Sequence, residues 1–156
     1  MIWNILCNSK VDSLEQYNKR NNIRVVGLKL QGGDAEQEIN ALLNDKLGLG
    51  IDMTSIDRIQ KIGSDGKSAL IVRFTSYLLR DRVYRSRIKL KLEKSTNQIY
   101  FNNDLTTTRS EIFRKARQLK KSRAIIDCWT WDGQIMVKDK MNKITRINKL
   151  NDLDVY

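Results

Sequence analysis

The sequence predicts an α+β fold: a four-stranded antiparallel sheet with two helices, preceded by an N-terminal helix and followed by a small helix–hairpin unit. Three observations lead to this prediction. Short β-branched segments alternate with helical ones over residues 22–103, a two-residue turn signal separates two later strands, and the chain contains no proline to interrupt a helix. With 156 residues the chain is one ordinary domain or two small ones, and it can bury a real core.

Residues 1–21 are expected to form a segment of their own. Helical periodicity covers residues 2–21, and the side chains near heptad a and d positions are Cys7, Val11, Leu14 and Asn18. About two heptads leave two interpretations open, the stub of a longer coiled coil or a helix packed on the domain. The heptad spacing slightly favours the stub.

Residues 22–103 are expected to form the sheet and its two helices. Strands are predicted at residues 23–30, 56–62, 69–74 and 99–102, and helices at residues 34–47 and 77–94. Asp34 is a typical helix N-cap, and a glycine-containing turn is predicted at residues 63–66. The inward stripe of the second helix is expected to contain Leu78, Leu79, Val83 and Ile88. The order β-α-β-β-α-β is the split β-α-β arrangement, whose best-known nucleic-acid-binding example is the RNA-recognition motif.

Residues 104–156 are expected to form a helix–hairpin unit. The helix is predicted at residues 106–123, and its packing residues are Ile112, Ala116 and Leu119. Asp132-Gly133 separates two short β-rich segments and is a typical type I′ hairpin turn. A third short strand is predicted at residues 144–147.

Positive charge is concentrated in the two predicted basic helices. Residues 77–94 contain seven basic and two acidic side chains, and residues 106–123 contain seven basic and one acidic. These segments account for the whole net charge of +11, because the remaining residues hold equal numbers of basic and acidic side chains. A basic helix face is often merely solvated, but two such helices indicate a surface for a polyanion.

Several function classes are disfavoured by what the sequence contains. There is no histidine, which removes the commonest general base and the commonest metal ligand, and the 18 acidic residues do not suggest a converging set. We therefore expect no enzyme activity, no catalytic residue, no metal and no cofactor. The two cysteines are far apart and typical of reduced thiols in the cytoplasm or nucleus rather than in a secreted protein. No apolar stretch reaches the roughly 20 residues needed to span a membrane.

The open face of the predicted sheet lacks the aromatic side chains that stack bases in an RNA-recognition motif. The third-strand signature of that motif matches residues 67–74 only at Lys67, Val72 and Phe74. Its two stacking positions hold Ala69 and Ile71, and the first-strand stacking position holds Arg24. Strand alternation places Arg24, Arg73 and Lys61 on this face. Without aromatic rings at these positions, the face can still bind nucleic acid by pairing with phosphates or by stacking a base on an arginine. The alternative is that such a domain serves protein contacts alone.

The candidate nucleic-acid contacts are cations and aromatic rings on these elements. They are Arg24, Lys61, Arg73, Arg80, Arg85, Arg87, Lys89, Lys91, Tyr100, Arg114, Arg117, Lys121, Trp129 and Trp131. Trp129 and Trp131 are two residues apart on one predicted strand and therefore share a face. They either stack on bases or pack the hairpin onto the preceding helix. A small hairpin has little else to bury, which favours the packing role for at least one of them.

Several segments occur in the serial order of a known family. They are residues 14–28 (LEQYNKRNNIRVVGL), 56–63 (IDRIQKIG), 70–74 (LIVRF), 99–106 (IYFNNDLT), 114–121 (RKARQLKK) and 129–138 (WTWDGQIMVK). In this order the chain resembles the first open-reading-frame protein of LINE-type retrotransposons. It is equally similar to the C-terminal domain of baculovirus few-polyhedra proteins, which also occurs in insect transposon-derived sequences.

The resemblance implies a trimer-forming coiled coil, a non-standard RNA-recognition-like domain and a C-terminal domain that together bind RNA and single strands as a chaperone. When the family's residues are carried over one by one, its junction arginine corresponds to Arg20, and we add Arg20 to the candidate nucleic-acid contacts. The arginine after its second strand is Lys61, which keeps the charge but not the planar fork of a guanidinium.

We therefore expect a sequence-tolerant, single-stranded nucleic-acid-binding protein that prefers RNA, with DNA as a second ligand. Self-association through the N-terminal helix and a chaperone activity are part of this hypothesis. The alternative is a viral or transposon-derived structural or regulatory protein that acts through protein–protein contacts.

Overall fold

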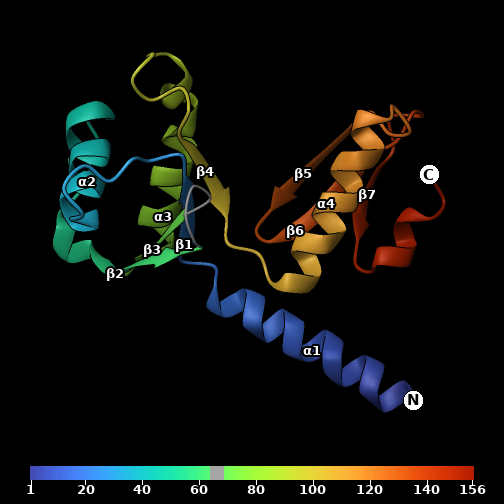
Figure 1. Cartoon of the computed structure of the whole chain (residues 1–156). Coiled ribbons are helices and arrows are strands. Elements are labelled where there is room, and N and C mark those ends of the chain that lie inside the picture. The colour runs from blue at the N-terminus through green and yellow to red at the C-terminus, as the bar shows by residue number, and fades with distance from the viewer. Residues whose placement is uncertain (64–68) are drawn as a thin grey trace. The chain divides into compact units, whose positions relative to one another are not determined.

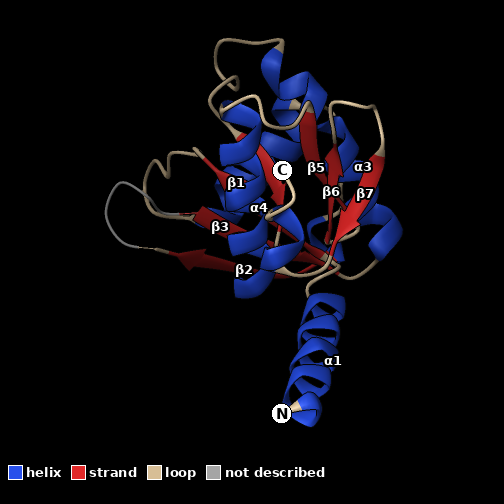
Figure 2. Ribbon diagram, turned by 90° about the vertical axis from the view of Figure 1, so that its right-hand side faces the viewer, coloured by secondary structure: helices blue, strands red, loops and turns tan. Residues whose placement is uncertain are grey.

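The chain forms two compact units, each with an antiparallel sheet (Figure 1). The computed structural model describes residues 1–63 and 69–156. We call Asn21–Asp104 the central unit, and Met1–Arg20 together with Leu105–Tyr156 the terminal unit. Both units combine helices and strands, so the predicted α+β class is confirmed (Figure 2). The N-terminal helix, which the sequence-based division set apart, groups with the C-terminal residues.

The central unit contains its elements in the predicted order. They are β1 (Asn22–Val26), α2 (Ala35–Asn40) with a π-helical continuation (Ala41–Lys46), β2 (Ile56–Ile62), β3 (Ala69–Phe74), α3 (Tyr77–Arg85) with a 3-10 continuation (Ser86–Lys91), and β4 (Tyr100–Asn103). A short 3-10 turn (Met53–Ser55) precedes β2. The sheet order is β2-β3-β1-β4, and each neighbouring pair is antiparallel. The turn predicted at residues 63–66 falls largely outside the described residues, as does Lys67.

β1 ends earlier than the sequence predicts because of Gly27. This residue has a φ of +85°, and a Cβ there would lie 2.1 Å from the carbonyl oxygen of Gln98. The left-handed backbone and the close approach both require glycine, so the strand stops at Val26. At the next element, Asp34 caps α2 as predicted, since its Oδ1 accepts from the Glu36 and Gln37 amides at 2.9 and 3.4 Å.

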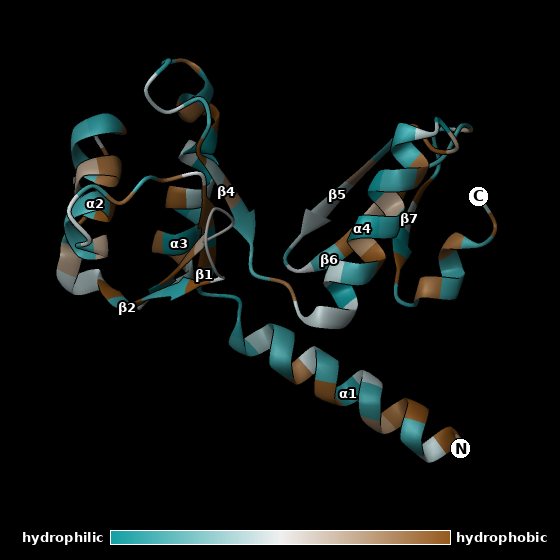
Figure 3. Cartoon of the chain, viewed as in Figure 1, coloured by the Kyte–Doolittle hydropathy of each residue, from teal (hydrophilic) through white to brown (hydrophobic). Residues whose placement is uncertain are grey.

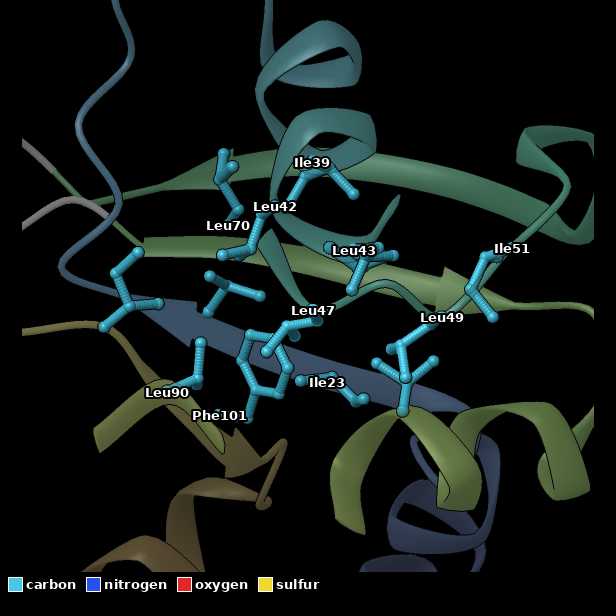
Figure 4. Packing of buried hydrophobic residues seen from close by; sticks show 14 of the residues in the cluster. Ile23, Ile39, Leu42, Leu43, Leu47, Leu49, Ile51, Leu70, Leu90 and Phe101 are labelled. Atoms are coloured by element: carbon cyan, nitrogen blue, oxygen red, sulfur yellow. The ribbon is translucent and has the colours of Figure 1, made fainter. Parts of the chain in front are cut away.

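The core of the central unit lies between one face of the sheet and the helices. Strand alternation places Ile23, Leu70 and Phe101 on this face, where they meet side chains of the α2 region such as Ile39 and Leu42 (Figure 4). Val72 and Phe74 also lie in this core, each 1% exposed. The predicted inward faces of β1 and β3 are therefore confirmed.

The inward stripe predicted for the second helix is only half right. Val83 is buried and Leu79 packs against the core, but Leu78 and Ile88 are 80% and 71% exposed. The α-helical period ends at Arg85, and Ile88 lies in the tighter 3-10 turn that follows. In that turn Leu90 takes the buried position instead.

The terminal unit contains a helix–sheet core and the N-terminal helix. Its elements are α1 (Ile2–Asn18), α4 (Thr107–Lys121), β5 (Asp127–Trp131), β6 (Gln134–Lys138), β7 (Ile144–Ile147) and a 3-10 turn (Leu150–Leu153). The sheet order is β5-β6-β7, all antiparallel. Asp132 and Gly133 have φ values of +47° and +72°, as the predicted type I′ turn requires. Ile112 and Ala116 of α4 pack on Cys128, Ile135 and Val137 of the sheet.

α1 is attached to the terminal unit by polar side chains. The Arg109 Nε donates to Asp12 Oδ2 at 2.8 Å, the Thr106 hydroxyl also contacts Asp12, and the Thr106 amide donates to Gln16 Oε1 at 3.0 Å. Apolar side chains elsewhere on α1 are exposed, among them Val11 at 55% and Leu14 at 66%. Figure 3 shows that hydrophobic and hydrophilic positions are interspersed along this helix. Over the described residues, no helix combines the length and apolar character needed to span a membrane.

Candidate nucleic-acid interface

The open face of the central sheet contains arginines on β1, β2 and β3, and an aromatic ring, Tyr100, on β4. Residues paired across strands share a face, so Arg24 lies in one row with Ile71 and Asn102, and Arg73 lies beside Arg58 in the next row. Arg24 and Arg73 are exposed. Arg73 Nε lies 3.4 Å from Asp57 Oδ2, with both side chains about half exposed (45% and 59%), and such a pair is weak enough for Arg73 to exchange partners.

The prediction that Lys61 lies on this open face is wrong. Lys61 pairs with Leu70, and Ile59 pairs with Val72, so all four side chains project toward the helix side. Lys61 is exposed because β2 is an edge strand. A register irregularity between Ile56 and Arg58 shifts the alternation by one residue.

The irregularity in β2 brings a different cation, Arg58, onto the open face. Its guanidinium donates to Gln60 Oε1 at 2.6 Å. Sequence reasoning missed Arg58 because residues 56–62 alternate only weakly between apolar and polar side chains, so the pattern does not assign their faces. The spacing of Ile56 and Ile59, which is three rather than two, was the available signal.

Arg80 is a structural residue and not an exposed phosphate contact. It is 6% exposed, its Nε donates to the Asn22 carbonyl at 3.1 Å, and its Nη2 donates to Asn103 Oδ1. Its guanidinium also lies 4.6 Å from the centre of the Tyr84 ring. The position of Arg80 one helical turn before Val83 places it on the buried face.

The other predicted cations around α3 are exposed or partly exposed. Arg85 forms an ion pair with Asp81 at 2.7 Å while remaining 78% exposed, and Arg87 stacks over Tyr84 at 4.1 Å. Lys89 and Lys91 are exposed, and the Lys91 ammonium lies 5.2 Å from the centre of the Tyr100 ring. Tyr100 is 47% exposed and pairs with Val26, which places it on the open face of the sheet. The structure thus brings Lys91 and Tyr100 together.

Arg20, which was carried over from the family resemblance, lies at the end of α1. Its guanidinium stacks over the Tyr17 ring at 3.7 Å, and its Nη1 donates to the Tyr17 carbonyl at 2.9 Å. These contacts fix the side chain, which remains partly exposed.

The predicted basic face of α4 is present. Arg114, Arg117 and Lys121 are exposed with no ion pair to any residue that the structure describes, while Ile112 and Ala116 are buried on the opposite side. Lys115 and Lys120 of the same helix are instead paired with Asp154 and Asp127. The hydrogen bond from Lys120 lowers the pKa of Asp127, and the same bond raises the pKa of Lys120. α4 therefore presents both neutralised and free cations.

Trp129 and Trp131 lie on the sheet face opposite α4. Their neighbours Cys128 and Thr130 pair with Val137 and Ile135 of the buried core, so the two tryptophans point the other way. Trp131 is 66% exposed and Trp129 is partly exposed. The expectation that at least one packs the hairpin onto α4 is wrong, because Ile135 and Val137 fill the sheet face that packs on this helix.

No metal centre is found in the described part of the chain, where no group of three or more histidine, cysteine, aspartate or glutamate side chains could hold a metal ion. Of the two cysteines, Cys7 is exposed, while burial raises the pKa of the Cys128 thiol.

A scan against models of known protein families finds no match to this chain, and a comparison with curated protein sequences finds none either.

Proposed function

We propose that the protein binds single-stranded nucleic acid, preferably RNA, with little sequence preference and mainly through its phosphates. The observation that carries this proposal is the free basic face of α4, where Arg114, Arg117 and Lys121 have no ion pair to a described residue. Arginine forms planar, two-pronged contacts with phosphate, and exposed lysines such as Lys89 and Lys91 add charge at low desolvation cost.

The topology of the central unit supports an RNA-recognition-like domain of non-standard type. The succession β-α-β-β-α-β and the sheet order β2-β3-β1-β4 are those expected of such a domain. Its open face has Arg24 at a position where a base-stacking aromatic ring would lie, and Arg58 and Arg73 lie in the next row. We infer that this face pairs with phosphates or stacks a base on an arginine, which is why we expect tolerance of sequence.

A salt titration of RNA binding tests the proposal. If about 6–10 phosphates are neutralised, the slope of log K against log salt for a single strand should be about −4 to −7. Filter binding with an unstructured oligonucleotide between 50 and 200 mM salt, about the physiological range, measures it. A flat slope would contradict phosphate binding, and a DNA oligonucleotide as competitor measures the preference for RNA.

A triple variant then locates the contacts. Arg114→Ala, Arg117→Ala and Lys121→Ala together should lower the magnitude of the salt slope by about 2, because each lost phosphate contact accounts for about 0.7. The matched control is Lys115→Ala with Lys120→Ala, whose ammonium groups are already neutralised by Asp154 and Asp127. A triple variant that binds like the unmodified chain would favour the alternative, a protein that acts through protein–protein contacts.

We also propose that copies of the chain associate through α1. Val11 and Leu14 share the exposed heptad positions of this helix, whereas Asp12 and Gln16 attach it to the terminal unit. Sedimentation equilibrium should then report a mass that falls to that of a monomer on Leu14→Ser, and a monomeric parent chain would rule the association out.

A further inference from the structure

The outer face of the β5-β6-β7 sheet has an ordered arrangement of aromatic and basic residues. Across the strands, Trp129 aligns with Met136 and Arg146, and Trp131 aligns with Gln134. The next row contains Asp127, Lys138 and Ile144. We call Trp129, Trp131, Met136 and Arg146 the tryptophan face.

The terminal unit's own core does not use the tryptophan face. The buried cluster of this unit contains Cys128, Ile135, Val137 and Ile147, which project from the other side of the same strands. Trp131 remains 66% exposed and Ile144 remains 54% exposed. An exposed aromatic group of this kind is typical of a binding surface rather than of ordinary protein surface.

Charge around the tryptophan face fits a polyanion. Residues 133–149 contain five basic side chains and one acidic side chain, although they lie outside the two basic helices. Arg146 is exposed within the face, and Lys138 lies in the adjacent row. The acid of that row, Asp127, is already bound by Lys120 at 2.6 Å. Rings flanked by cations match a ligand that presents both planar bases and phosphates.

The spacing of the two rings favours unstacked bases. Alternate residues on a strand are about 6.6–6.8 Å apart, whereas stacked bases in a duplex rise by about 3.4 Å per nucleotide. Two rings that lie twice the stacking distance apart each stack on a separate base of a single strand whose bases are unstacked. A duplex offers no free base faces to them.

We propose that the tryptophan face stacks the bases of single-stranded nucleic acid and thereby sets a preference for single strands over duplexes. This inference rests on the proposed function and deepens it by assigning base contact to the terminal unit. The cationic helices would bind the phosphates of either form, and Trp129 and Trp131 would distinguish between them.

The test compares oligo(U) RNA with a blunt RNA duplex of equal nucleotide number, by fluorescence anisotropy of a labelled strand. Trp131→Ala should weaken oligo(U) binding by about 5- to 150-fold, since a base–aromatic stack contributes about 1–3 kcal/mol. Duplex affinity and the salt slope should not change. Trp131→Phe keeps a ring and should restore most of the affinity.

Trp3→Ala is the matched control, because Trp3 is 86% exposed on α1 and outside the tryptophan face. Trp131 is itself largely exposed, so its removal should leave the fold intact, and urea unfolding of each variant verifies this. Trp129→Phe provides a second, conservative variant at the more buried position, for which a smaller loss of single-strand affinity is expected.

The outcomes separate this inference from the proposed function. If the unmodified chain shows salt-dependent binding and Trp131→Ala binds both RNAs equally well, the tryptophan face is refuted while phosphate binding stands. Equal losses of affinity for oligo(U) and for the duplex in Trp131→Ala would also refute it. A change in the oligomeric state of Trp131→Ala with unaltered RNA binding would refute it as well, because the tryptophan face would then bind a second copy of the chain. If the unmodified chain binds neither RNA, the proposed function itself fails.

Discussion

Arg80 shows how a cation in a basic helix can serve the fold rather than a ligand. Its guanidinium donates to the Asn22 carbonyl and to Asn103, and it lies against the Tyr84 ring. A charge that is only 6% exposed is stable only where its N–H groups find such partners. Arg85, five residues later, is 78% exposed and has one surface ion pair. Composition alone counts the two residues as equal.

Replacing Arg80 should therefore destabilise the central unit. We expect Arg80→Met to lower the free energy of unfolding by about 2–4 kcal/mol, because it removes a donor to the Asn22 carbonyl and to the Asn103 amide oxygen. Arg85→Met is the control and should cost less than about 0.5 kcal/mol. Urea unfolding followed by circular dichroism measures both. Equal stability of the two variants would contradict the structural role of Arg80.

The faces of some strand residues could be predicted from the sequence, and the faces of others could not. The faces of β3 followed from alternation, so the buried positions of Leu70, Val72 and Phe74 were predictable. The face of Lys61 was not, because the irregularity in β2 depends on how that strand pairs with β3. The expectation that Trp129 or Trp131 packs on α4 was wrong, because it assumed that a small hairpin has little else to bury, whereas Ile135 and Val137 supply its buried face.

At the scale of elements, local signals were sufficient for most helices and strands. β2, β3 and β7 have the predicted bounds, and Asp132-Gly133 forms the predicted turn. The attachment of α1 had no local signal. Asp12 meets Arg109, a residue 97 positions later, and sequence spacing does not encode such a pairing. The heptad pattern covers the exposed side of α1. The polar side of this helix, with Asp12 and Gln16, makes the contacts with the rest of the terminal unit.

The Asp12–Arg109 pair should measurably stabilise the terminal unit. Its side chains are 19% and 14% exposed, and Arg109 Nη1 also donates to the Gly133 carbonyl at 2.8 Å. We expect Asp12→Ala to reduce the free energy of unfolding by about 1–3 kcal/mol, since it leaves a part-buried guanidinium without its carboxylate.

A surface pair of the same unit provides the comparison for Asp12. Asp154 is 60% exposed in its ion pair with Lys115, so Asp154→Ala should cost less than about 1 kcal/mol. A double-mutant cycle with Arg109→Met isolates the coupling between Asp12 and Arg109. If Asp12→Ala costs no more than Asp154→Ala, α1 is not held by this pair.

The whole molecule contains no histidine, so the response of its stability to pH depends on its carboxyl, thiol and ammonium groups. Hydrogen bonds to Thr54 lower the pKa of Asp52, the Lys120 hydrogen bond lowers that of Asp127, and the Asn148 and Lys149 amides lower that of Asp152, each below the usual 3.8. A carboxyl whose pKa is lower in the folded state stabilises that state above its unfolded pKa. This contribution is lost as the pH falls through the folded value.

The alkaline side is limited by two other groups. Burial raises the pKa of Cys128 above 9.0, so the unfolded chain ionises first and stability decreases as the pH rises beyond that value. The pKa of Lys120 is raised above 10.5 by Asp127, and its contribution is present below 10.5 and lost as the pH rises through the folded value. No histidine titrates between these limits.

We therefore expect a plateau in stability between about pH 5 and pH 8, with losses beginning below about pH 4 and above about pH 9. Urea midpoints measured at constant ionic strength across this range test the expectation. Asp152→Asn should lessen the loss of stability in acid, because its amide oxygen can still accept a hydrogen bond but no longer titrates. Glu15→Gln, at an exposed position on α1, serves as the comparison for removing a charge alone. A midpoint that shifts between pH 5.5 and 7.5, inside the plateau where only a group with a pKa near about 6.5 would titrate, would contradict this assignment of the titrating groups.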